Sequence, residues 1–123
     1  MPKHSVITVC WNKLVEVSQP CIPTFYQTSE DWQFIVVSNG CNDGTLDWLL
    51  GQQKEHPEVP LEIVPLEENR GYSGGINAGL AIAEGEFVTV QNNDLVCHHS
   101  KWATALVAPL EENPRRLVGA RLI

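Results

Sequence analysis

Several features that would assign this sequence to a class of proteins are missing from it. Its 123 residues contain no apolar run near the ~18 residues that a membrane-spanning helix needs. The start of the chain lacks the long apolar segment of a secretory signal. Positive charge is also scarce, because 8 Lys and Arg stand against 15 Asp and Glu, a net charge of −7. Binding to nucleic acid or to an anionic membrane depends on clustered Lys and Arg, so we expect neither partner. The cysteine usage described next predicts a cytoplasmic location.

Cysteine spacing excludes a common kind of metal site. The four cysteines form no C-x-x-C pair and no zinc-type pattern; they are Cys10, Cys21, Cys41 and Cys97. Three of them sit in or beside apolar runs, so we predict reduced, mostly buried thiols. A secreted domain with two disulfides is the alternative.

Linkers, repeats and charge runs are absent as well. The length is that of one domain, which we place at residues 1–123. With 43% apolar and 19% charged residues, the composition is that of an ordinary globular protein and not of a disordered chain.

What the sequence does show is an alternation of short β-branched runs with longer mixed segments. The runs predict strands at residues 5–10, 34–37, 61–64, 87–90 and 117–123. The mixed segments predict helices at residues 13–28, broken or kinked by its two prolines, and at 45–56, 76–83 and 102–112. This order predicts a doubly wound α/β fold, with a mostly parallel sheet and helices on both faces. Such sheets bind ligands beyond the carboxyl ends of their strands, where the strand order reverses, so the turns there are the candidate sites.

The turn after the fourth predicted strand reads Gln-Asn-Asn-Asp at residues 91–94. Mg²⁺ and Mn²⁺ take oxygen ligands, often one or two from protein and the rest from phosphates and water. Asp94 and Asn92 are the candidate metal ligands, and Asn92 and Asn93 are also placed to reach phosphate or ribose. The alternative is an ordinary turn with self-bonded side chains. The histidine pair at residues 98–99 either completes a metal site or is simply solvated.

A glycine-rich turn at residues 69–75 precedes the third predicted helix. Glycines there let backbone N–H groups and the positive end of the helix dipole approach an anion, and Arg70 adds a cation suited to phosphate. Arg70, Gly71 and Asn77 are the candidate nucleotide-binding residues of this stretch. Alternatively, the glycines only allow close packing. The spacing matches neither a Walker loop nor a dinucleotide fingerprint.

The turns after the first two predicted strands offer an aromatic ring, amides and a carboxylate. Together they suit a nucleobase, held by ring packing and edge hydrogen bonds. The candidate nucleotide-binding residues here are Cys10, Trp11, Asn12, Ser38, Asn39 and Asp43. The alternatives are that Trp11 belongs to the core and that Asp43 caps the following helix.

In order and spacing, these turns resemble the N-terminal, nucleotide-sugar-binding half of inverting family 2 glycosyltransferases with the GT-A fold. The matching stretches are residues 6–12, 34–45, 68–79 and 83–94. The resemblance implies a site for a nucleoside-diphosphate sugar and a divalent cation, Mg²⁺ or Mn²⁺. Trp11 and residues 38–39 would face the base, and residues 92–94 would stand at the family's D-x-D position. It also implies an acceptor glycan or lipid-linked sugar, and Asn-Asn-Asp resembles members that transfer deoxysugars such as rhamnose.

Two departures from the family pattern matter. Ser38 stands where the family has an aspartate that accepts the base N–H, and serine accepts without charge assistance. The family's domain is longer, with its acceptor-binding half and catalytic base downstream, so we assign no catalytic residue. We expect a truncated chain or half of an assembly, with the terminal strand able to pair with a second copy. A non-catalytic binding or assembly module is the alternative function. Sugar-nucleotide synthesis would require a glycine- and basic-rich loop after the first strand, which is not present.

Overall fold

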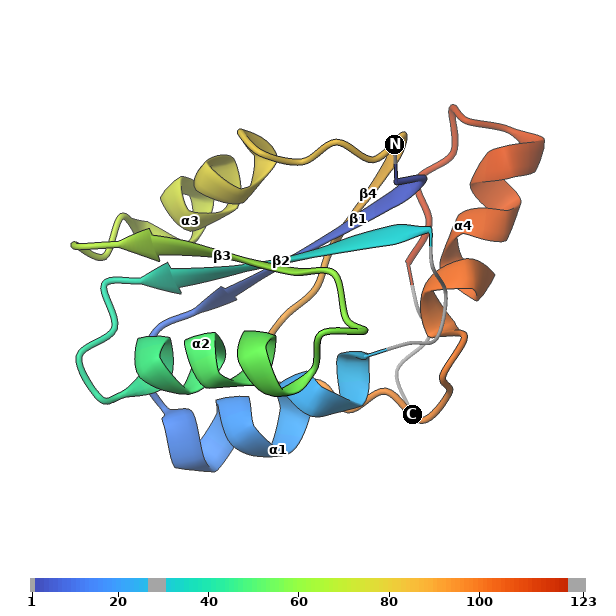
Figure 1. Cartoon of the computed structure of the whole chain (residues 1–123). Helices are drawn as coiled ribbons and strands as arrows, with labels where there is room; N and C mark the ends of the chain where they lie inside the picture. Colours follow the sequence, from blue (N-terminus) through green and yellow to red (C-terminus); the bar gives the residue numbers. More distant parts are fainter. Residues whose placement is uncertain (1, 27–30, 120–123) are drawn as a thin grey trace.

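The computed structural model describes residues 2–26 and 31–119. Its four described strands form one parallel sheet in the order β3-β2-β1-β4 (Figure 1). Their bounds are His4–Cys10 (β1), Trp32–Asn39 (β2), Leu61–Leu66 (β3) and Phe87–Val90 (β4). The predicted α/β fold with a parallel sheet is confirmed. Of the fifth predicted strand, residues 117–119 are not in a strand, and residues 120–123 lie outside the described residues.

The strand order explains where a cleft can open. β1 has β2 on one side and β4 on the other, so the order reverses between β1 and β4. β4 also ends earlier along the sheet than β1 does. Its last residue, Val90, pairs with Ile7, which lies three residues before the end of β1. The chain that follows β4 therefore runs beside the free end of β1. This is the position where parallel α/β sheets bind ligands.

Helices cover both faces of the sheet, as predicted (Figure 1). One face carries the larger apolar cluster and lies against α2 (Thr45–Glu55) and the helical segment from Leu14 to Phe25. The other face carries Ile7, Ile35 and Val37, which α3 (Gly71–Leu80) covers. The third crossover thus packs on the face opposite the first two, since right-handed connections change face when the winding direction reverses.

The first predicted helix is present but divided. A short π-helix, η1 (Leu14–Ser18), continues into α1 (Gln19–Cys21) and a 3₁₀-helix, η2 (Ile22–Phe25). Pro20 and Pro23 fall near the starts of the second and third pieces, where a missing N–H does least harm. The expected extension to residue 28 lies outside the described residues.

The glycine-rich stretch is helix rather than loop. α3 begins at Gly71, so the predicted start at residue 76 is wrong. A Cβ on Gly75 would lie 2.8 Å from the Val9 side chain, and one on Gly79 would lie 2.6 Å from that of Ile7. These two glycines therefore let α3 pack closely on β1, which is the alternative that the sequence left open.

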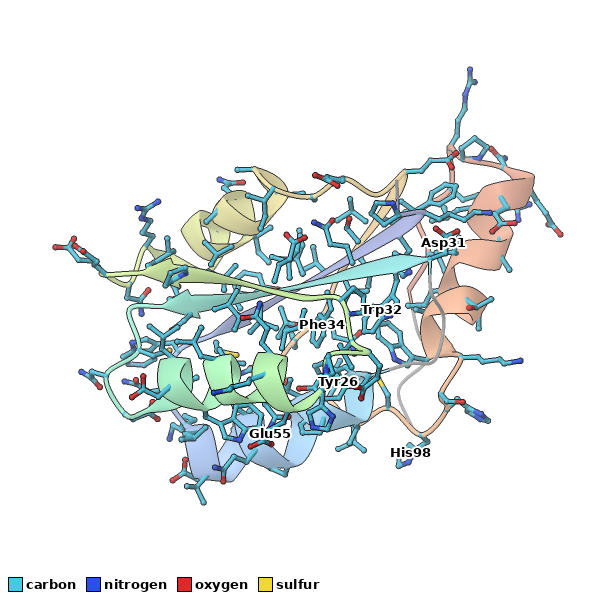
Figure 2. All side chains as sticks on the ribbon, in the orientation of Figure 1. Tyr26, Asp31, Trp32, Phe34, Glu55 and His98 are labelled. Atoms are coloured by element: carbon cyan, nitrogen blue, oxygen red, sulfur yellow. The ribbon has the colours of Figure 1, made fainter. Side chains whose placement is uncertain are left out.

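An aromatic cluster lies in the larger apolar core, near the amino ends of the strands. Trp32 stacks on Phe34 with ring centroids 5.3 Å apart, and Tyr26 and Phe25 meet Phe34 edge-on or tilted, each at 6.1 Å. Figure 2 shows Trp32, Phe34 and Tyr26 between the sheet and the helices below it. α4 (Trp102–Glu112) has its predicted bounds and closes the amino end of the sheet, where the Trp102 indole donates to the Phe25 carbonyl at 3.1 Å.

The amino edge also carries a buried polar network. The Gln33 amide oxygen accepts from the Ser5 hydroxyl at 2.7 Å and from the Glu84 N–H at 2.9 Å, while its amide nitrogen donates to the Ile82 carbonyl at 3.1 Å. The Ser5 hydroxyl in turn accepts from the Gly85 N–H at 2.8 Å. The network fastens the turn between α3 and β4 to the sheet.

All four cysteines are free, and Cys10 and Cys21 are buried. Cys41 and Cys97 are partly exposed, so two of the four thiols are buried as predicted. Among residues 2–26 and 31–119, no helix has the length and apolarity to cross a membrane.

Candidate functional site

A cleft of about 540 Å³ opens at the carboxyl edge of the sheet, at the point where the strand order reverses. It lies between the turns that follow β1 and β4 and the starts of η1 and α3. Its lining residues are Val9, Trp11, Lys13, Glu16, Val17, Asn39, Asn69, Gly71, Tyr72, Asn92, Asn93 and Asp94. The structure thus brings together six of the candidate residues: Trp11, Asn39, Gly71, Asn92, Asn93 and Asp94.

The turn after β1 has an uncommon backbone. Asn12 and Lys13 both have left-handed conformations, with φ values of 54° and 59°. Asparagine adopts this region readily, but lysine rarely does. Trp11, just before them, is 54% exposed and lines the cleft, so the alternative that it belongs to the core is wrong.

The first two turns are bonded to each other. The Asn12 side-chain oxygen accepts from the Asn42 N–H at 2.8 Å, and the Asn12 N–H donates to the Cys41 sulfur at 3.3 Å. The Cys41 thiol donates to the Cys10 carbonyl at 3.4 Å. Asn12 therefore holds the turn rather than lining the cleft.

Asp43 caps backbone groups, as one alternative predicted. One carboxylate oxygen accepts from the Thr45 N–H at 3.1 Å and from its hydroxyl, and the other accepts from the Leu14 N–H at 3.0 Å. These bonds, above all the one from the Thr45 hydroxyl, lower the pKa of Asp43 from its ordinary value. The carboxylate fixes the starts of α2 and η1 and lies outside the cleft lining.

Cys10 and Ser38 end the paired part of β1 and β2, where they face each other in register. Both are buried and neither lines the cleft. Burial raises the pKa of the Cys10 thiol to about 12, so it is a neutral group. These two residues therefore lie beneath the cleft and do not form part of its surface.

Asn39 fastens the glycine-rich segment to the sheet. Its amide nitrogen donates to the Asn69 side chain at 3.1 Å and to the Gly71 carbonyl at 3.0 Å, and its oxygen accepts from the Arg70 N–H at 3.0 Å. The next residue, Gly40, has a φ of 71°, and a Cβ there would collide with the backbone nitrogen of Asn69. Only glycine permits this close approach.

The start of α3 differs from a free anion-binding helix end. The Gly71 N–H donates to the Asn69 side chain at 2.8 Å, and the Arg70 N–H is bound by Asn39, so both amides already have partners. The Arg70 side chain lies outside the cleft lining. Asn77 is exposed and also outside it, because the earlier start of α3 places Asn77 in the helix's second turn.

The turn after β4 presents its carboxylate to the cleft. Asp94 is exposed and lines the cleft, and the Asn92 side-chain oxygen accepts from the Tyr72 hydroxyl at 3.2 Å. His98 and His99 lie outside the lining. Within the described residues, no group of three or more His, Cys, Asp or Glu side chains is arranged to hold a metal ion.

Several lining residues escaped the sequence reasoning. Tyr72 lies inside the glycine-rich stretch, and the signal that could have found it is that it carries the aromatic ring of that stretch. Lys13 follows a predicted site turn directly, and Glu16 and Val17 come one helical turn later. Glu16 and Val17 could not be inferred from the sequence, because the π-helix on which they lie (η1) has no clear sequence signal.

The fold and the cleft define an α/β domain of the GT-A type, and the comparison with known proteins gives the family. The model of "Glycosyl transferase family 2" matches residues 5–123. The chain therefore belongs to glycosyltransferase family 2.

Two curated relatives illustrate the match. The putative teichuronic acid biosynthesis glycosyltransferase TuaG of Bacillus subtilis is 32% identical over 93 residues, which are 76% of this chain and 36% of that protein. The dolichyl-phosphate beta-glucosyltransferase of Drosophila melanogaster is 32% identical over 89 residues, which are 66% of this chain and 27% of that protein. The chain thus spans only about a third of these relatives.

Solved structures agree. The mannosyltransferase PcManGT from Pyrobaculum calidifontis, in complex with GDP-Man and Mn²⁺, superposes with a TM-score of 0.76 at 25% identity, covering 89% of this chain and 32% of that one. S. aureus TarS (residues 1–349) in complex with UDP-GlcNAc gives 0.75 at 22% identity, covering 98% and 36%, which shows a shared fold.

Proposed function

We propose that this chain is the donor-binding part of a family 2 glycosyltransferase and that the carboxyl-edge cleft binds a nucleoside-diphosphate sugar with a divalent cation. One observation carries the proposal: Trp11 and Asp94, from the turns after β1 and β4, line a single cleft where the strand order reverses. The mannosyltransferase that resembles this chain is in complex with GDP-Man and Mn²⁺, which supports the same ligand chemistry here.

The charge of the cleft supports a cation requirement. The lining carries one ammonium group, that of Lys13, and two carboxylates, those of Glu16 and Asp94, so its net charge is negative. A diphosphate would be repelled from such a surface. A divalent cation bound beside Asp94 would reverse the balance.

The donor set fits Mg²⁺ or Mn²⁺. Asp94 offers an exposed carboxylate and Asn92 an amide oxygen, and such ions commonly take one or two protein ligands and complete their shell with phosphate and water. When bound, the cation neutralises the negative charge that develops on the leaving diphosphate.

The remaining candidate residues divide into two groups in this proposal. Trp11 offers a ring face to the base, while Asn39 and Gly71 line the cleft beside it. The others act through the turns they hold or lie beyond the cleft lining; these are Cys10, Asn12, Ser38, Asp43, Arg70 and Asn77. Because Ser38 is buried, the choice of base rests on other groups than the family's carboxylate.

In the reaction we propose, an acceptor hydroxyl on a glycan or lipid-linked sugar attacks the anomeric carbon of the donor. The bond from that carbon to the nucleoside diphosphate breaks, and the hydroxyl proton passes to a base that we assign to no described residue. The chain therefore supplies donor binding. The free thiols are in keeping with a cytoplasmic protein, and rhamnose as the transferred sugar stays a prediction.

The test is a calorimetric titration of the chain with UDP, TDP and GDP, each with and without Mn²⁺. We expect at least one nucleotide to bind in the micromolar range only when Mn²⁺ is present. Asp94→Asn should weaken that binding at least tenfold, about 1.4 kcal/mol, because the amide keeps the shape but loses the charge that holds the cation.

Glu55→Gln is the matched control, since it also changes a carboxylate to an amide but lies at the end of α2 (Figure 2), outside the cleft lining, and should leave binding unchanged. Failure of all three nucleotides to bind the wild-type chain would favour the non-catalytic binding or assembly module instead.

A further inference from the structure

Two backbone N–H groups and the one cation at the start of α3 are not available to a diphosphate in the cleft. The N–H groups of Arg70 and Gly71 already donate to Asn39 and Asn69, and the Arg70 side chain lies outside the lining. The glycine-rich segment therefore offers an anion fewer free N–H groups and less positive charge than its sequence predicts. A diphosphate in this cleft needs positive charge from another element.

Lys13 is the cationic side chain that lines the cleft. In the part of the chain that the structure describes, its ammonium group takes part in no ion pair. It extends from the turn after β1, while Asp94 follows β4. A ligand between these two turns would meet the lysine and a cation bound beside Asp94.

The backbone of Lys13 shows that the residue is held there against its own preference. Its φ is 59° and its ψ is 42°, a left-handed conformation that glycine or asparagine adopts at much lower cost. Both neighbours are fixed, Asn12 by its bond to Asn42 and Leu14 by its bond to Asp43. Strained positions that the surroundings hold in place are concentrated at binding sites.

We propose that Lys13 is a binding residue for the diphosphate of the donor, contacting its oxygens with the ammonium group. This inference rests on the proposed function, because it names a contact of the same ligand in the same cleft. In this proposal the left-handed turn directs the lysine into the cleft. The strained backbone lowers the stability of the fold, and the contact with the diphosphate is what it permits.

The experiment compares Lys13→Gln and Lys13→Gly with the wild-type chain, using whichever of UDP, TDP and GDP binds best in Mn²⁺ and the matching nucleoside without phosphates. Both variants should weaken diphosphate binding about tenfold, because a charge-assisted bond is lost. Nucleoside binding should stay within twofold. Lys13→Gly should also melt at a higher temperature than Lys13→Gln, because glycine relieves the left-handed strain.

Lys54→Gln, an exposed lysine in the last turn of α2, is the control and should bind like the wild type. Unchanged diphosphate affinity in Lys13→Gln overturns the inference and leaves the proposed function in place. An equal loss of nucleoside and diphosphate binding also overturns it, since that marks a merely structural role. A wild-type chain that binds no nucleotide overturns the proposed function and this inference with it.

Discussion

The two edges of the sheet are built from different kinds of interaction. At the amino edge, Gln33 and Ser5 are buried and bonded to each other and to the backbone, beside stacked aromatic rings. At the carboxyl edge, Trp11 and Asp94 are exposed, and the hydrogen bonds there mostly join one turn to the next. The difference indicates that the amino edge provides stability while the carboxyl edge is kept open for a ligand. Substitutions at the two edges should therefore have separable effects.

The largest effect is expected from Phe34→Ala at the amino half of the core. Phe34 is fully buried and meets three other rings, so its removal leaves a cavity and should lower the free energy of unfolding by about 3–5 kcal/mol. Urea denaturation measures this loss. Val90→Ala, at a side chain 48% exposed on the edge strand, should change stability by less than ~1 kcal/mol. Similar losses in both variants would contradict the comparison.

The second effect is a pH dependence that arises from His4 at the same edge. Burial lowers the pKa of His4 from 6.5 to about 4, so the folded state keeps the ring neutral where the unfolded chain would protonate it. Stability is therefore complete above pH 6.5 and is lost as pH falls towards 4, by up to about 3 kcal/mol from this residue.

Denaturation curves at pH 7 and pH 4.5 measure this contribution as the difference between the wild type and His4→Gln. The variant should lose less stability on acidification than the wild type does. His99→Gln, at an exposed ring, should lose as much as the wild type. Parallel pH curves for the wild type and His4→Gln would show that the ring is not held neutral.

The smallest effect separates the edges by removing one hydroxyl from each. Tyr72→Phe deletes the bond to Asn92 at the cleft, and Tyr26→Phe deletes a bond of 3.0 Å to the Gln52 side chain near the amino edge. We expect Tyr72→Phe to weaken Mn²⁺-dependent nucleotide binding about threefold while stability changes by less than ~0.5 kcal/mol, because the bond is exposed. Tyr26→Phe should lower stability by about 1 kcal/mol and leave binding alone. Calorimetry and urea denaturation of both variants test this, and a reversed pattern would contradict it.

Much of the fold was predictable because its signals are local. β-branched runs gave the strands of the described sheet, and α4 has its predicted bounds. α3 was missed at its start because glycine is a poor helix former, and the reason for Gly75 and Gly79 lies in contacts with β1 that are distant in sequence. The misplaced Asn77 follows from that error, since a shift of five residues in the helix start moves it by more than a turn.

The candidate site was predicted in outline and not in its details. The rule that ligands bind where strand order reverses placed Trp11 and Asp94 at the same edge of the sheet, and in the structure both line one cleft. It could not tell a lining residue from a supporting one. The side chains of Asp43 and Asn12 accept hydrogen bonds from backbone N–H groups of neighbouring turns. That role is visible only once the arrangement of the turns in space is known.

The left-handed pair at Asn12 and Lys13 has a practical consequence for anyone who evolves this domain in the laboratory. A library screened for heat resistance alone would enrich glycine or asparagine at position 13, and each enriched clone would look like an improvement. With Lys13 in the role that we propose, survivors of such a screen would be more stable proteins that bind their nucleotide more weakly. Selection for this scaffold should therefore include a ligand-binding step in every round.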